Sequence, residues 1–99
     1  MPVTIEKPFR IQVQKVETKM YLVSILYDKY ISWEFCIYIL MEVFHKSREQ
    51  AEAITDVILT DGEAICGMYT FDIADTKATI VEEKAKKEGF SLQCLIEEV

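Results

Sequence analysis

Residues 62–89 read GEAICGMYTFDIADTKATIVEEKAKKEG, and this is the most informative part of the chain because a strand pattern turns directly into a helix pattern. Small and branched apolar residues dominate 63–69, after which Thr70 can cap a helix that keeps its apolar period up to Gly89. Gly62 suits the left-handed residue that closes a preceding helix. The sequence therefore predicts a helix end, a strand and a long helix in succession.

The flanking segments add two strands and two helices. Residues 20–27 (MYLVSILY) alternate along one face and are rich in branched and aromatic side chains, which favours a strand. Ser32 can cap a helix that runs to about His45, and Ser47 starts a capping box for a second helix. Residues 91–97 alternate again, which favours a third strand.

The expected order is β-α-α-β-α-β over residues 20–99, which implies an α+β domain in two layers, a three-stranded antiparallel sheet packed with three helices. Residues 1–19 combine charged residues with isolated apolar ones and contain Pro8. We expect a mobile N-terminal tail there. The alternation of Ile11 and Val13 with glutamines leaves an extra strand open as the alternative.

Length and charge exclude several classes of protein. A chain of 99 residues is expected to form one domain, and its net charge of −6 without a basic stripe argues against nucleic acid as a partner. The longest apolar stretch, 33–44, is interrupted by Glu34 and Glu42 and is shorter than the roughly 18 residues of a membrane span. No signal-peptide pattern is present, so we expect a cytoplasmic protein that does not enter a membrane.

No residue pattern indicates catalysis, a cofactor or a metal. The sole histidine, His45, falls at a predicted helix end, where a cation is favourable for the helix dipole. Cys36, Cys66 and Cys94 lack the spacing of a zinc or disulfide motif, and burial among apolar residues raises the pKa of a thiol and lowers its reactivity. The glycines are dispersed and form no phosphate-binding loop. We therefore expect a protein that is not an enzyme and that keeps its thiols reduced and buried.

The first predicted helix has almost no polar face. Between Trp33 and Phe44 nearly every residue is apolar, so this helix should be covered on several sides or line a cleft. Packing between the sheet and the second helix is the simpler interpretation for most of these residues. Trp33, beside the polar break at 28–31, is the best candidate to line a ligand cleft.

Several segments of the sequence resemble the ClpS adaptor family. The resemblance extends without gaps over about residues 19–99 and is carried by 20–23, 34–35, 43–47, 62–70, 73–74 and 76–77, above all by AICGMYT at 64–70 and ADTK at 74–77. Members of that family bind the N-terminal residue of N-degron substrates and hand the substrate to the hexameric unfoldase ClpA. The resemblance thus implies the fold expected above and an adaptor function, with a Clp-family AAA+ unfoldase and substrate N-termini or peptides as partners.

By that resemblance, the ligand pocket of this chain has diverged from the family pattern. Its ten positions are Tyr27, Asp28, Lys29, Ile31, Trp33, Cys36, Thr55, Ile58, Leu59 and Leu92. Tyr27 and Leu59 stand where the family has an Asn and a His that accept hydrogen bonds from the ligand's ammonium group, and Trp33 replaces a gatekeeping Met. The loss of two hydrogen bonds to the charged ammonium group, at about 1.5 to 3 kcal/mol each, implies roughly hundred-fold to ten-thousand-fold weaker N-degron binding.

The resemblance also implies that Asp72, Thr76 and Lys77, at the start of the long helix, face the N-terminal domain of the unfoldase. We expect the protein to be a monomer. Asp72 and Thr76 are four residues apart and project on one side of a helix. Three alternatives stay open: an orthodox N-degron adaptor, a peptide-binding module of the same fold without a protease partner and, least favoured, a small enzyme.

Overall fold

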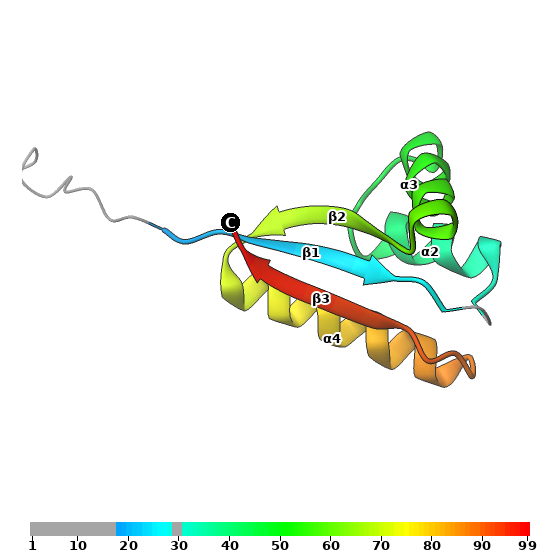
Figure 1. Ribbon diagram of the computed structural model, residues 1–99. Coiled ribbons are helices and arrows are strands. Elements are labelled where there is room, and N and C mark those ends of the chain that lie inside the picture. The colour runs from blue at the N-terminus through cyan, green and yellow to red at the C-terminus, as the bar shows by residue number, and fades with distance from the viewer. Residues whose placement is uncertain (1–17, 29–30) are drawn as a thin grey trace, which may run out of the picture.

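The computed structural model describes residues 18–28 and 31–99. Along the chain it contains β1 (Tyr21–Leu26), α2 (Trp33–Glu42), α3 (Arg48–Asp61), β2 (Glu63–Tyr69), α4 (Phe71–Lys87) and β3 (Gln93–Glu98). This order confirms the expected β-α-α-β-α-β arrangement of an α+β domain. Figure 1 shows α4 running alongside the sheet below β3, with α2 and α3 packed together on the side of β2.

The first strand lies at the centre of an antiparallel sheet of order β2-β1-β3. Its residues pair with both neighbours, so that Ile25 stands between Ala64 of β2 and Cys94 of β3. The register with β2 shifts between Val23 and Ser24, which places a bulge at this point of the ladder. Because β1 is flanked by a strand on each side, its branched and aromatic composition fits its position.

The two faces of the sheet differ in what covers them. Val23 and Ile25 on β1 are fully buried and join the core formed with the three helices, as does Cys66 on β2. The alternate residues form the opposite face, where Ile65 is 56% exposed and Leu95 is 37% exposed. The domain therefore has helices on one side of the sheet and an open face on the other.

The predicted boundaries of the second helix are confirmed. Ser47 and Gln50 form a reciprocal capping box, in which the Gln50 N–H lies 3.1 Å from Ser47 Oγ and the Ser47 N–H lies 3.0 Å from Gln50 Oε1. Gly62 closes α3 in the left-handed conformation, with φ 92°, and its N–H donates to the Ile58 carbonyl at 3.0 Å. Thr70 stands at the N-cap position of α4 as expected, but its side chain makes no capping hydrogen bond.

The first helix is shorter than predicted. It ends at Glu42 rather than at about His45, because His45 takes a left-handed conformation with φ 56°. A right-handed helix cannot continue through such a residue. The Lys46 N–H instead donates to the Leu40 carbonyl at 3.1 Å and turns the chain toward α3.

The outer strand boundaries also shift by one or two residues. The first strand is one residue shorter at each end than the predicted 20–27, and β3 begins two residues later than the predicted 91–97. In β3 the shift arises because the Ser91 N–H donates to the Asp28 carboxylate at 3.2 Å and not to a neighbouring strand. The segment before β3 is thereby attached to the loop after β1.

The expected N-terminal tail at 1–19 lies mostly outside the described residues, which begin at Thr18. Its last residue, Lys19, pairs with Glu98 at 3.5 Å beside the end of β3. Within the part of the chain that the structure describes, no helix has the length and apolar character needed to cross a membrane.

Candidate functional site

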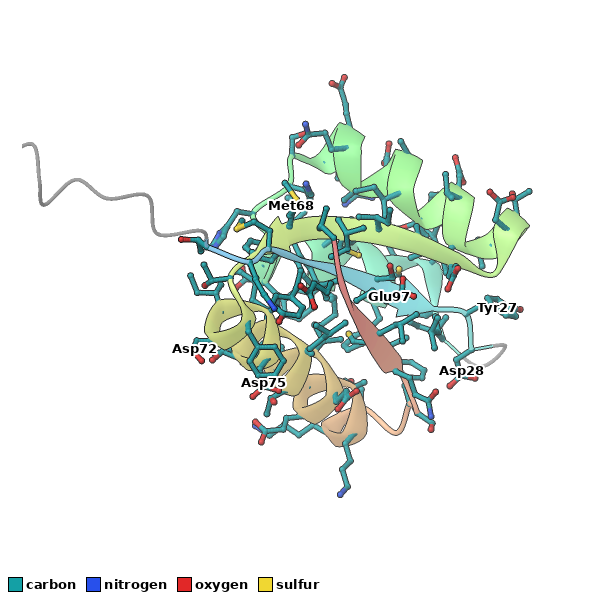
Figure 2. All side chains as sticks on the ribbon, turned by 60° about the vertical axis from the view of Figure 1, so that its left-hand side comes forward. Tyr27, Asp28, Met68, Asp72, Asp75 and Glu97 are labelled. Atoms are coloured by element: carbon teal, nitrogen blue, oxygen red, sulfur yellow. The ribbon has the colours of Figure 1, made fainter. Side chains whose placement is uncertain are left out.

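The loop that follows β1 is anchored on both sides. The Tyr27 N–H donates to the Gly62 carbonyl at 2.8 Å, which ties the loop to the turn between α3 and β2. The Asp28 carboxylate accepts the Ser91 N–H at 3.2 Å, which ties the loop to the segment before β3. Tyr27 and Asp28 consequently lie at the end of the sheet where three segments distant in sequence meet (Figure 2).

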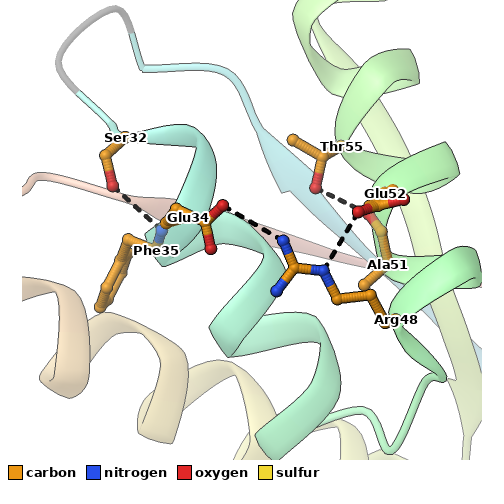
Figure 3. Close-up of polar contacts among 7 residues, drawn as sticks. All are labelled: Ser32, Glu34, Phe35, Arg48, Ala51, Glu52 and Thr55. Carbon is orange, nitrogen blue, oxygen red and sulfur yellow. Dashed lines mark hydrogen bonds and ion pairs between the residues drawn. The ribbon is translucent and has the colours of Figure 1, made fainter.

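Trp33 is placed by the start of α2. Ser32 has extended backbone angles and its Oγ accepts the Phe35 N–H at 3.0 Å, so the helix begins at Trp33 (Figure 3). A serine cap of this kind stabilises a helix by about 1 kcal/mol. Trp33 stays 38% exposed, so the side chain predicted to line a cleft is at the surface and not in the core.

An ion cluster holds the first turn of α2 against α3. Arg48 Nη2 lies 3.2 Å from Glu34 Oε2, and Arg48 Nε lies 3.1 Å from Glu52 Oε2 (Figure 3). These side chains are well exposed, so each pair contributes no more than about 1 kcal/mol. Arg48 was not among the residues predicted from the sequence, where its four-residue spacing to Glu52 is the available signal.

Four of the predicted pocket residues form a closed wall. Cys36, Thr55 and Ile58 are each 1% exposed and Leu92 is 4% exposed, so they offer almost no surface to a ligand in this conformation. The Thr55 hydroxyl donates to the Ala51 carbonyl at 2.8 Å within its own helix, which satisfies its polar group (Figure 3). Burial raises the pKa of the Cys36 thiol, and the neighbouring Thr55 hydroxyl partly offsets the effect.

The remaining pocket residues are more open. Tyr27 and Leu59 are 46% and 47% exposed, and Leu59 stands in the last turn of α3. Ile31 is half-buried, and its N–H donates to the Asp28 carbonyl at 2.9 Å. Lys29 lies outside the described residues. Among the pocket positions that the structure describes, Asp28 alone carries a negatively charged acceptor.

Two of the predicted docking residues share an exposed face of α4. Asp72 and Thr76 are both exposed, and Thr76 Oγ1 donates to the Asp72 carbonyl at 2.9 Å. Asp75 is exposed on the same turn of the helix, and Figure 2 labels it next to Asp72. The N-terminal end of α4 therefore presents an acidic surface to the solvent.

The third predicted docking residue, Lys77, is turned toward the interior. Its ammonium donates to the Val43 carbonyl at 2.6 Å, just beyond the end of α2. The same nitrogen lies 5.2 Å from the ring centroid of Tyr69 and 5.9 Å from that of Phe44, within the range of a cation–π contact. Lys77 thus connects α4 to α2 and β2.

Two of the three thiols are buried as the sequence predicted, and the third is only half-buried. All are free, with Cys36 and Cys66 buried and Cys94 half-buried. Burial raises the pKa of Cys66 to about 12 and that of Cys94 to about 12. Thiols that stay protonated near neutral pH are poor nucleophiles.

The chain is similar to known proteins in sequence and in structure. Residues 16–95 match the family described as ATP-dependent Clp protease adaptor protein ClpS. The ClpS proteins of Nitratidesulfovibrio vulgaris (strain DP4) and Helicobacter hepaticus are 48% and 46% identical to it, over 82% and 84% of this chain and 78% and 84% of their own lengths. A solved structure, Agrobacterium tumefaciens ClpS2 bound to L-phenylalaninamide, has a TM-score of 0.81 at 30% identity and covers 84% of this chain and 100% of its own.

Proposed function

Since this chain belongs to the ClpS family of adaptor proteins of the ATP-dependent Clp protease, we propose that it docks on a Clp-family unfoldase through α4 and carries a ligand pocket with altered N-degron specificity. ClpS proteins are adaptors of the protease and not enzymes, so this chain is an adaptor that influences proteolysis without cleaving substrates itself. The altered specificity rests on one observation, the exposed Tyr27 and Leu59 side chains at the pocket positions.

A protonated α-amino group needs several acceptors when it leaves water for a protein pocket. Leu59 offers none from its side chain, and Tyr27 offers a phenol at the end of a long, exposed ring. The Asp28 carboxylate already accepts the Ser91 N–H, which fixes its position. With two acceptors missing, at about 1.5 to 3 kcal/mol each, N-terminal Phe, Leu, Tyr or Trp should bind roughly a hundred-fold to ten-thousand-fold more weakly than in a complete pocket.

The closed wall supports the same proposal. Cys36, Thr55 and Ile58 would have to separate before a large apolar side chain could enter between α2 and α3. Separating these side chains would disrupt their packing, and this cost reduces the affinity for a large ligand side chain. A smaller or differently shaped ligand residue fits this pocket better than an aromatic one.

An orthodox N-degron adaptor is the second candidate. Two observations favour it: Asp28 supplies a carboxylate at the pocket, and the Agrobacterium relative is described as bound to L-phenylalaninamide. In that case Asp28 carries most of the ammonium site. Asp28→Ala should then abolish the binding of a peptide with a free N-terminal Phe, whereas it changes little if the pocket has diverged.

Docking on the unfoldase is proposed to use the exposed side of α4. Asp72 and Thr76 supply a carboxylate and a hydroxyl to one surface, and Asp75 adds a second negative charge. Surfaces of this charge attract Lys and Arg on a partner and accelerate encounter. The Lys77 ammonium is bound to the Val43 carbonyl, so we expect Lys77 to stabilise the packing of α4 and to contribute little to docking directly.

Calorimetric titration with the isolated N-terminal domain of a Clp unfoldase tests this docking surface. Asp72→Lys should lower the affinity about fivefold or more, since it replaces an attraction by a repulsion. Asp56→Lys is the matched control, because Asp56 is also exposed but lies on α3. An affinity that Asp72→Lys leaves unchanged, or that both variants lower equally, places the docking surface elsewhere.

We also propose that the protein is a cytoplasmic monomer. Its three cysteines are free, which suits a reducing compartment. A net charge of −6 on each chain opposes self-association. Light scattering after size-exclusion chromatography should give the mass of one chain, and twice that mass would contradict the proposal.

A further inference from the structure

A hollow of about 370 Å³ lies on the open face of the sheet, next to the last turns of α3. Its lining includes Ser24, Val57, Asp61, Glu63, Ile65 and Glu97. We propose that this hollow binds the guanidinium side chain of an arginine carried by a partner polypeptide. The proposal stands independently of the N-degron pocket and of the docking surface on α4.

Three carboxylates surround the hollow, and each comes from a different element. Asp61 ends α3, Glu63 begins β2 and Glu97 lies on β3. None of the ion pairs within residues 18–28 and 31–99 involves these three side chains. Glu97 is labelled in Figure 2, well apart from Asp72 on α4. The hollow therefore carries negative charge without a cation of its own.

A buried hydroxyl at the base of the hollow is the second, independent sign of a ligand. Ser24 is 5% exposed and lies on the open face of β1, between Ile65 and Leu95. None of the side-chain hydrogen bonds of the described residues uses its Oγ, yet no fully buried side-chain oxygen in those residues lacks a partner. The Ser24 Oγ must consequently reach solvent, and it does so through the hollow that it lines. The hydroxyl is therefore open to the hollow and can accept a hydrogen bond from a donor that enters it.

The spread of the acceptors favours a guanidinium over a metal ion or an ammonium. Within the described residues, no group of three or more His, Cys, Asp or Glu side chains is arranged to hold a metal ion. The planar guanidinium group distributes five N–H donors over a wide fork, which suits separated carboxylates, whereas the lysine ammonium is a compact point charge. Val57 and Ile65 are 42% and 56% exposed and offer apolar contact to the side chain's methylene stem.

The direct test is an NMR titration of the ¹⁵N-labelled full-length chain with Nα-acetyl-arginine N-methylamide. This probe has no free N-terminus, so it cannot report on an ammonium pocket. Saturable shifts are expected at the amides of Ser24, Glu63, Ile65 and Glu97, with a dissociation constant in the millimolar range. The lysine analogue should bind at least threefold more weakly, and the neutral citrulline analogue should give no saturable shift.

Two variants with matched net charge separate this site from general attraction to an acidic protein. Glu63→Gln combined with Glu97→Gln should weaken binding of the arginine probe at least tenfold. Glu49→Gln combined with Glu83→Gln removes two exposed carboxylates elsewhere and should leave binding within twofold. Ser24→Ala, which adds no volume, should weaken binding about threefold. Equal binding of the citrulline or lysine analogue, equal loss in both double variants, or shifts that never saturate would each overturn the proposal.

Discussion

Replacing Lys77 by Met tests whether this residue belongs to the fold or to the docking surface. Methionine keeps most of the apolar stem and removes the ammonium that donates to the Val43 carbonyl at 2.6 Å. The Val43 residue is 5% exposed, so its carbonyl loses a partner in a place that water reaches poorly. The rings of Tyr69 and Phe44 lose a cation at 5.2 and 5.9 Å.

The expected loss follows from these contacts. A hydrogen bond from a charged donor contributes about 1.5 to 3 kcal/mol, and a partly exposed cation–π contact about 0.5 to 1 kcal/mol. Lys77 is only half-buried, so the sum should lie near the lower end, at about 2 kcal/mol. For a domain of this size, 1 kcal/mol corresponds to roughly 4 to 8 °C in Tm, so Tm should fall by about 8 to 16 °C.

Urea unfolding followed by circular dichroism measures the change, with Lys86→Met on the exposed side of α4 as the control. The control should change the free energy of unfolding by less than about 0.5 kcal/mol. Calorimetry with the unfoldase N-terminal domain, at a temperature where both variants are folded, should show little change in affinity for Lys77→Met. Unaltered stability together with a tenfold loss of affinity would refute the reasoning, because Lys77 would then be a free docking cation.

Three further predictions concern stability. Gly67→Ala should destabilise the domain by about 1 to 3 kcal/mol in urea unfolding, because the added Cβ would lie 2.6 Å from Cζ of the packed Tyr69 ring. An unchanged urea midpoint would mean that the ring moves aside freely. Ser32→Ala should cost about 1 kcal/mol through the lost cap on the Phe35 N–H, and Ser32→Gly only a few tenths. Burial raises the pKa of Cys66 to about 12, against about 8.5 in an unfolded chain. Below about pH 8.5 the thiol is protonated in both states and the folded state keeps its full stability, which is then lost as the pH rises toward 12. The urea midpoint should therefore fall between about pH 9 and 11, and Cys66→Ala should make that fall shallower.

Local signals in the sequence predicted the framework because they depend on few residues. Gly62 and the Ser47 capping box act through their own backbone geometry, and both boundaries were confirmed. The predicted end of α2 was wrong, because no local sequence signal indicates that His45 takes φ 56°. Histidine adopts this conformation more often than most residues but not often enough for prediction.

The side-chain geometry at the site could be anticipated only in part. Resemblance placed Asp28 and Trp33 at a pocket, but the contact of Asp28 with Ser91 joins residues 63 positions apart. Helical spacing put Asp72 and Thr76 on one surface, yet it could not reveal that Lys77, one residue further, points to a carbonyl of another helix. Such contacts depend on how helices pack, which periodicity does not encode.

Fluorescence anisotropy with a labelled peptide that begins with a free Phe tests the altered ligand specificity most directly. The same peptide with an acetylated N-terminus measures the contribution of the ammonium group. Because the side chains of Tyr27 and Leu59 replace two acceptors, binding should be on the order of a hundred-fold weaker than that of an orthodox adaptor, and acetylation should change it little. Sub-micromolar binding that acetylation and Asp28→Ala both abolish would contradict this account and establish an orthodox N-degron pocket.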